Sequence, residues 1–240
     1  MKKAKRQRRK LLYILVGILT ALLCALFLLV FFTNRANVLQ DEEPQDPGRV
    51  YAVVNNELGS AGGIEIIHAY IPWDSPRRPG EVREIRYITI HETDNRSRGS
   101  DAEAHSRYLL NDANDSTSWH YTVDDGHIYH HLPDNEIAWN AGDQRTKYGG
   151  NINGIGIEMC VNIDGDYDQT LRNTAALTAA LLDNYGMTMD DVRFHSDFMH
   201  KVCPHRLITE GRTGEFLHMI EEDLLEIQAA KAAPAEGEGE

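Results

Sequence analysis

Alternating apolar and polar positions predict strands in the first half of the folded region. EIRYITIHET (residues 84–93) alternates β-branched and aromatic residues with polar ones, and His91 falls near its end. TSWHYTVDDGHIYHHLP (residues 117–133) has two such arms around a DDG turn, which predicts a β-hairpin. Between them, DAEAHSRYLLND repeats apolar positions at helical spacing, with Ala102, His105 and Leu109 on one side.

The second half continues this alternation of strands and helices. GIGIEMCVNI and VRFH have the length and composition of strands, whereas TLRNTAALTAALLDNYG predicts a helix ended by Gly186. TGEFLHMIEEDLLEI predicts a last helix whose apolar face is formed by Phe216, Ile220, Leu224 and Ile227. Strands alternating with helices indicate an α/β fold with a single mixed β-sheet flanked by helices, over residues 62–228.

The N-terminal residues have a different pattern. Residues 11–32 form an uncharged run of 22 residues after a basic segment, residues 1–10. A helix of this length spans a bilayer core of ~30 Å. A cleaved signal peptide is the alternative, but its apolar region is usually shorter and ends at a small-x-small site. We therefore expect a transmembrane helix at 11–32, a cytoplasmic N-terminus, and an extracytoplasmic domain at the cell membrane.

Charge and composition separate the remaining segments. Residues 33–61 are polar and contain Pro and Gly, as expected of an extracytoplasmic linker, and residues 229–240 read as a disordered acidic tail. Residues 36–240 contain 16 basic and 37 acidic residues, a net charge of −21. Such an acidic region argues against nucleic acid as a partner.

The stretch FHSDFMHKVCPHRL (residues 194–207) contains the candidate chemistry. His91, His195 and Cys203 each follow a predicted strand or lie in the next loop, and zinc prefers His nitrogen and Cys sulfur. Lys201 lies near enough to place an ammonium beside the metal's substrate and to favour the Cys203 thiolate. Two alternatives stay open. The histidines can be ordinary surface or half-buried side chains, and Cys203 can form a disulfide with Cys160.

Glu158 is a lone acid inside the apolar run GIGIEMCV. Burying a carboxylate is costly unless it is paired or functional, so the choice is between a structural salt bridge and a catalytic role. Strand alternation places Ile155, Ile157 and Met159 on one face. The other face has Glu158 with two glycines that we expect to leave room for a substrate or water.

These residues resemble the zinc-dependent N-acetylmuramoyl-L-alanine amidases of the type-2 amidase family, which is related to phage endolysins, autolysins and peptidoglycan recognition proteins. The matching stretches YITIHET, SWHYTVDD, NEIAWNAGD, IGIEMCVNIDGDY and H-x7-CPHR occur in family order. The resemblance implies that His91, His195 and Cys203 bind one Zn²⁺. It also implies that Glu158 is the catalytic acid and that Lys201 faces the metal-bound species.

The same resemblance suggests substrate contacts and marks two departures. Trp119, His120 and Asn140 fall where relatives line the cleft, although relatives often have His in place of Asn140. Glu92 and Thr93 stand where many relatives have HNT or HCT, so Glu92 adds an acid beside the first ligand. Neither departure removes a ligand or the catalytic acid.

The implied activity is hydrolysis of the amide between N-acetylmuramic acid and the L-alanine of the stem peptide. Two alternatives are a non-catalytic peptidoglycan-binding module and a zinc peptidase that cuts elsewhere in the stem. We expect a monomer whose membrane helix holds it near peptidoglycan, in place of a cell-wall-binding repeat.

Overall fold

A seven-stranded mixed sheet organises the residues that the computed structural model describes, 56–111 and 115–233. The strand order across it is β1-β2-β5-β4-β6-β3-β7. The strands are β1 (Ser60–Ala61), β2 (Ile64–His68), β3 (Tyr87–Glu92), β4 (Tyr121–Val123), β5 (Ile128–His130), β6 (Gly154–Met159) and β7 (Val192–Phe194). The predicted strands in 84–93 and 154–163, the hairpin and VRFH are all present.

The centre of the sheet is parallel. β3 lies between β6 and β7 and runs parallel to both, and β4 runs parallel to β6. The predicted hairpin gives the antiparallel pair β4–β5, and β2 then adds to β5 in parallel. The carboxyl ends of β3, β6 and β7 therefore meet at one edge of the sheet, where side chains distant in sequence converge.

Helices cover both faces of the sheet. They are α2 (Ala102–Leu110), α3 (Gly150–Asn153), α4 (Tyr167–Tyr185), α5 (His205–Thr209) and α6 (Thr213–Ala232), with short 3₁₀ turns η1 (Met189–Asp191) and η2 (His195–Asp197). The Asp166 side chain accepts a hydrogen bond from Gln169 N at the start of α4. Gly186 ends α4 in the left-handed conformation (φ 65°), as predicted.

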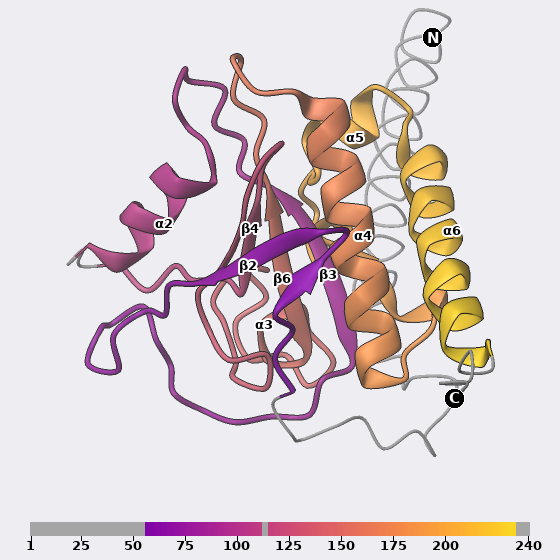
Figure 1. Cartoon of the computed structure of the whole chain (residues 1–240). Coiled ribbons are helices and arrows are strands. Elements are labelled where there is room, and N and C mark those ends of the chain that lie inside the picture. The colour runs from indigo at the N-terminus through magenta and orange to yellow at the C-terminus, as the bar shows by residue number, and fades with distance from the viewer. Residues whose placement is uncertain (1–55, 112–114, 234–240) are drawn as a thin grey trace, which may run out of the picture. The chain divides into compact units, whose positions relative to one another are not determined.

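The main core lies between the sheet and the pair α4 and α6. Ile90 and Ile157 project into it from neighbouring strands, and Phe216 projects from α6; all three are fully buried. Figure 1 shows α4 and α6 side by side on one side of the sheet and α2 on the other. Since side chains alternate along a strand, the residues next to Ile90 in β3 and next to Ile157 in β6 face the side of the sheet where α2 lies.

The membrane part of the predicted fold class is wrong, whereas its single mixed sheet with flanking helices is confirmed. Within residues 56–111 and 115–233, no helix is both long and apolar enough to cross a bilayer. The longest described helices, α4 with 19 residues and α6 with 20, each carry several charged side chains. The predicted span, residues 11–32, lies outside the described residues.

The ordered elements extend beyond the predicted limits of the domain. β1 begins at Ser60, inside the segment assigned to the linker. It pairs with β2, which begins just after that segment. At the other end α6 continues to Ala232, past the predicted boundary at residue 228.

Candidate active site

Strand register brings the predicted site residues together. His91 and Glu158 are directly paired across β3 and β6, so their side chains project from the same face. Ile90 is paired with Phe194 of β7, which places the next residue, His195, beside His91. Cys203 joins them from the loop that leads into α5.

Two imidazoles and a thiol form the centre of the site. The Nδ1 atoms of His91 and His195 are 3.0 Å apart, and their ring centroids are 4.7 Å apart. One ligand atom from each of His91, His195 and Cys203 lies within 4.8 Å of the others, and all three residues are buried. Cys160 and Cys203 are free thiols, so the disulfide alternative is wrong.

The pKa values of His91 and His195 favour the neutral form of both rings. Burial lowers the pKa of His91 well below its usual value, and the neighbouring His195 and Lys201 lower it further. Burial, together with Lys201, lowers the pKa of His195 to about 4. Both rings are therefore neutral at physiological pH, which is the form that binds a metal ion. A backbone hydrogen bond to Ala141 also orients His195.

The Cys203 thiol differs from the sequence-based expectation. Burial raises the pKa of Cys203 to about 12, the Glu158 carboxylate adds to the rise, and Lys201 only partly opposes it. Lys201 alone therefore does not produce a thiolate here. A divalent cation held between the thiol and the two imidazoles would do so. The donor set fits such an ion, so these three residues can hold a metal.

Glu158 and Lys201 face a common cleft next to this cluster. The cleft has a volume of about 370 Å³, and its lining includes both residues together with Trp119 and Tyr108. Glu158 Oε1 lies 4.0 Å from His91 Nδ1, and the side chain is 13% exposed. Burial raises the pKa of Glu158 to about 8, although Lys201 lowers it. The carboxyl group can thus exchange a proton near neutral pH.

Glu92 has a role that the sequence did not reveal. Its carboxylate accepts hydrogen bonds from the backbone N–H groups of Arg206 (2.6 Å) and Leu207 (3.0 Å) and from the Tyr167 hydroxyl. It therefore fixes the start of α5 and the loop that presents Cys203. The sequence signal was the acid directly after the ligand His91, which suggested a second charge in the cleft.

The three predicted substrate contacts occupy different environments. Trp119 lines the cleft, stacks near Tyr108 and donates from Nε1 to Thr122. His120 is fully buried: its Nδ1 accepts from Gly156 N, and its Nε2 lies 2.9 Å from the Glu136 carbonyl oxygen. Both ring nitrogens of His120 are therefore engaged within the domain, and His120 does not line the cleft.

Asn140 fills the space beside Glu158 that the glycines were expected to leave open. A Cβ atom on Gly156 would clash with Asn140 Nδ2, so the amide packs directly on the strand. Among the described residues, neither amide atom of Asn140 has a hydrogen-bond partner, and neither does Glu158 Oε2. Of these two residues, Glu158 lines the cleft and Asn140 does not.

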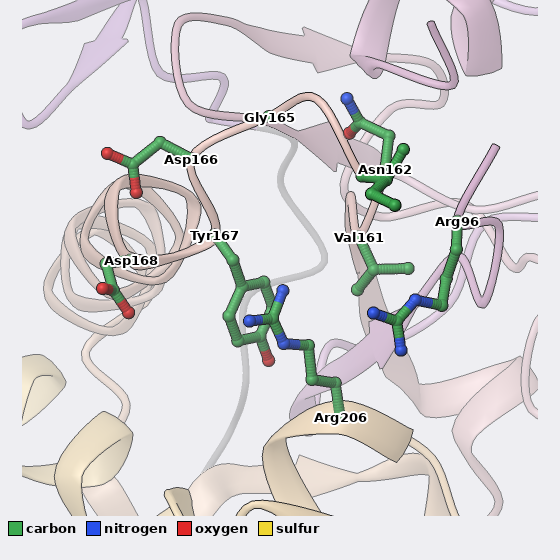
Figure 2. A pocket seen from close by; sticks show the side chains of 9 residues that line it. Arg96, Val161, Asn162, Gly165, Asp166, Tyr167, Asp168 and Arg206 are labelled. Carbon is green, nitrogen blue, oxygen red and sulfur yellow. The ribbon is translucent and has the colours of Figure 1, made fainter. Parts of the chain in front are cut away.

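A second cavity, of about 330 Å³, is lined by the loop between β6 and α4 and the start of α4, together with Arg96 and with Arg206 of α5. Figure 2 shows Tyr167 and Arg206 on one side and Arg96 on the other. The Arg206 guanidinium stacks over the Tyr167 ring at 4.0 Å. The catalytic candidates Glu158 and Lys201 do not line this cavity, so the cleft beside Glu158 is the better candidate for chemistry.

The fold and site together define an α/β domain with a candidate metal-assisted hydrolytic centre. A family model described as N-acetylmuramoyl-L-alanine amidase matches residues 81–206, which contain all the predicted ligands and Glu158. The chain belongs to this N-acetylmuramoyl-L-alanine amidase family.

Individual relatives agree with this assignment. The chain is 42% identical over 145 residues to N-acetylmuramoyl-L-alanine amidase XlyA of Bacillus subtilis (strain 168), covering 60% of this chain and 48% of the relative. It is 40% identical to the amidase CwlH of the same organism, covering 60% and 57%. The chain thus spans about half the length of the curated relatives it matches.

Solved structures give the same result for the fold. The structure of the catalytic domain of XlyA matches with a TM-score of 0.62 at 40% identity, covering 65% of this chain and 99% of that domain. The structure of PlyL matches with a TM-score of 0.60 at 28% identity, covering 65% and 97%. The matched part of this chain therefore corresponds to nearly the whole of each solved domain.

Proposed function

We propose that this protein is a zinc-dependent peptidoglycan amidase that hydrolyses the amide between N-acetylmuramic acid and the L-alanine of the stem peptide. The main support is the convergence of His91, His195 and Cys203 within 4.8 Å of one another, beside Glu158 and Lys201. Family membership supports the same activity. The proposal places the domain outside the cytoplasm, on the cell-wall side, and acting as a monomer.

The ligand set favours zinc over other biological metals. Two imidazoles and a thiolate are ligands that zinc prefers, and three protein ligands leave a fourth position for a reactant. In such sites zinc supplies Lewis-acid polarisation of a carbonyl and activation of water near neutral pH.

Glu158 is the proton-transfer group in this proposal. Its Oε2 atom is buried without a hydrogen-bond partner among the described residues, so it can accept a proton from the attacking water. The same carboxyl then returns that proton to the departing alanine nitrogen, which is a poor leaving group until protonated. A pKa of about 8, raised by burial, suits both steps.

Lys201 stabilises the negative charge that develops on the carbonyl oxygen. It is exposed and lines the same cleft as Glu158. An ammonium group in this position favours the tetrahedral oxyanion over the neutral amide. Trp119 lines the cleft beside these groups and offers an apolar surface to the substrate.

Product analysis on purified cell walls tests the proposal. We expect the full chain to release peptides that begin with a free L-alanine amine, identified by mass spectrometry. A chelator should abolish the release, and added zinc should restore it. Binding to walls without any cleavage, or cleavage between other stem residues, would contradict the proposal.

A further inference from the structure

A second group of metal-ligating side chains lies away from the candidate active site. Glu57, His68 and His130 each offer one ligand atom, and these atoms lie within 4.8 Å of one another. Within the described residues, it is the one other such group besides His91, His195 and Cys203. The family resemblance assigned no role to any of its members.

Strand register places the two imidazoles side by side. His68 and His130 are directly paired at the ends of the parallel strands β2 and β5, so both project from the same face. Their Nδ1 atoms are 3.2 Å apart. Two nitrogens bound to one tetrahedral zinc at 2.0–2.1 Å would be separated by about 3.3–3.4 Å. The two rings are therefore already spaced as a pair of ligands.

Oxygen donors converge on the same point. Glu57 Oε2 lies 3.8 Å from His68 Nδ1, and the Tyr70 hydroxyl lies 3.3 Å and 3.4 Å from the Nδ1 atoms of His68 and His130. The side chains of His68 and Glu57 are 36% and 29% exposed, so an ion can enter from solvent. Small side-chain rotations at this open edge would bring the Glu57 carboxylate to bonding distance.

A buried carboxylate lies behind the inner histidine. His130 Nε2 lies 3.2 Å from Asp134 Oδ1, and both side chains are fully buried. The Tyr185 hydroxyl donates to Asp134 (2.7 Å), and the Tyr121 ring stacks on His130 at 4.2 Å. A carboxylate on the far nitrogen of a histidine is the usual support for a metal ligand, because it leaves the near nitrogen's lone pair directed at the ion.

This group lies on the opposite face of the sheet from the candidate active site. His130 is paired with Tyr121, Tyr121 with Ile157, and Ile157 with Ile90. Paired residues share a face and successive residues alternate, so His130 and Ile90 project to the side opposite His91. The second group is therefore independent of the cleft that contains Glu158.

We propose that Glu57, His68 and His130 bind a second divalent transition-metal ion, for which zinc is the test ion. Imidazole nitrogens with one carboxylate suit zinc and its first-row neighbours. Glu57 precedes β1, whereas the histidines lie on β2 and β5. The ion thus ties the segment that enters the domain to the edge of the sheet and stabilises the fold without taking part in hydrolysis. This inference does not rest on the proposed function.

The test is zinc stoichiometry in the full chain after chelator treatment, measured by titration with a competing zinc indicator. We expect two equivalents in the unmodified protein and one in Cys203→Ser, which removes the sulfur of the other cluster. His68→Ala in the Cys203→Ser background should remove the remaining equivalent. His218→Ala is the matched control, because His218 is exposed and lies 3.2 Å from Glu222 on α6. It should leave the count unchanged.

A second variant distinguishes loss of a metal ligand from loss of the folded structure. Glu57→Gln alters one exposed ligand and should keep the fold, while zinc affinity at this site falls at least about 10-fold. Added zinc should raise the Tm of Cys203→Ser and leave the Tm of Cys203→Ser/His68→Ala unchanged. The proposal is overturned if Cys203→Ser/His68→Ala binds as much zinc as Cys203→Ser, or if the unmodified protein binds a single equivalent that Cys203→Ser loses. Neither result depends on amidase activity.

Discussion

Glu158 combines burial, a raised pKa and an unpaired oxygen, which are features of a proton-transfer group. Glu158→Gln keeps the size and shape of the side chain but cannot accept the proton of water. We expect kcat on purified walls to fall by about 10²–10⁴-fold, with the zinc content and the Tm retained. Release of L-alanine-terminated peptides over time gives the rate, and metal analysis gives the zinc content.

A matched control separates this effect from loss of negative charge in general. Glu84→Gln changes the same chemical group at a site where the side chain is 49% exposed and pairs with Arg86. This variant should keep its full rate. Near-normal turnover in Glu158→Gln would show that another group moves the proton.

The Asn140 amide occupies the space that a side chain at Gly156 would take. Gly156→Ala should destabilise the protein by about 1–3 kcal/mol, because a methyl group would overlap Asn140 Nδ2. The combination with Asn140→Ala should recover most of this loss, since it removes the overlapping atoms. The free energies of unfolding of both single variants and the double variant, from urea denaturation, give the coupling.

Gly214→Ala is the control for adding a methyl group to a glycine. A Cβ atom at Gly214 would meet nothing within 4 Å, so α6 should tolerate it or become slightly more stable. Purely additive effects of Gly156→Ala and Asn140→Ala would mean that the amide does not fill this space in solution.

At the scale of elements, α5 depends on a residue from β3. Two N–H groups at the start of α5 donate to the Glu92 carboxylate, which is 4% exposed. Glu92→Gln offers one acceptor oxygen in place of two and removes the negative charge. We expect a loss of about 1–3 kcal/mol in the free energy of unfolding. Zinc affinity should fall as well, because the loop that holds Cys203 is less firmly placed.

Urea denaturation and competition with a zinc indicator measure the two effects of Glu92→Gln. Glu210→Gln is the control at the C-terminal end of the same helix, because Glu210 is 42% exposed and pairs with the Arg206 side chain at the surface. Equal zinc affinity in Glu92→Gln and the unmodified protein would contradict a role for Glu92 in positioning Cys203.

Elements with a strong periodic pattern were predictable from the sequence, and those defined by pairing were not. The helix ended by Gly186 and the DDG hairpin have local signals, and both are confirmed. β2 was missed: IEIIH is short, and it forms a strand because its backbone adds to β5, which lies some 60 residues further on. Long-range pairing of this kind has no signature within the segment itself.

The candidate site shows the same limit. His91 and Glu158 were predictable as neighbours once both were placed at the ends of parallel strands, and they are directly paired. Nothing local distinguishes His120, whose two nitrogens are used inside the sheet, from a histidine at the cleft. Burial of one side chain depends on the order of all the strands, which the sequence pattern did not determine.

At the scale of the whole molecule, the sheet separates stability from chemistry. The large core lies on the α4 and α6 side, whereas His91 and Glu158 project from the other face. Phe216 of α6 is fully buried in that core. Phe216→Ala removes a large apolar side chain and leaves a cavity, so it should cost about 3–5 kcal/mol in the free energy of unfolding. This is a large part of the 5–15 kcal/mol typical of a domain.

Activity should respond differently from stability to the loss of Phe216. At a temperature where Phe216→Ala is still folded, kcat per folded molecule should stay close to that of the unmodified protein, because the site lies across the sheet. Leu225→Ala shortens an apolar residue of the same helix that is 59% exposed, and it should change the stability by less than about 0.5 kcal/mol. Thermal unfolding and initial rates at 15 °C and 37 °C measure both quantities. A fall in kcat at 15 °C for Phe216→Ala, with the protein fully folded by circular dichroism, would show that the core and the cleft are coupled through the strands.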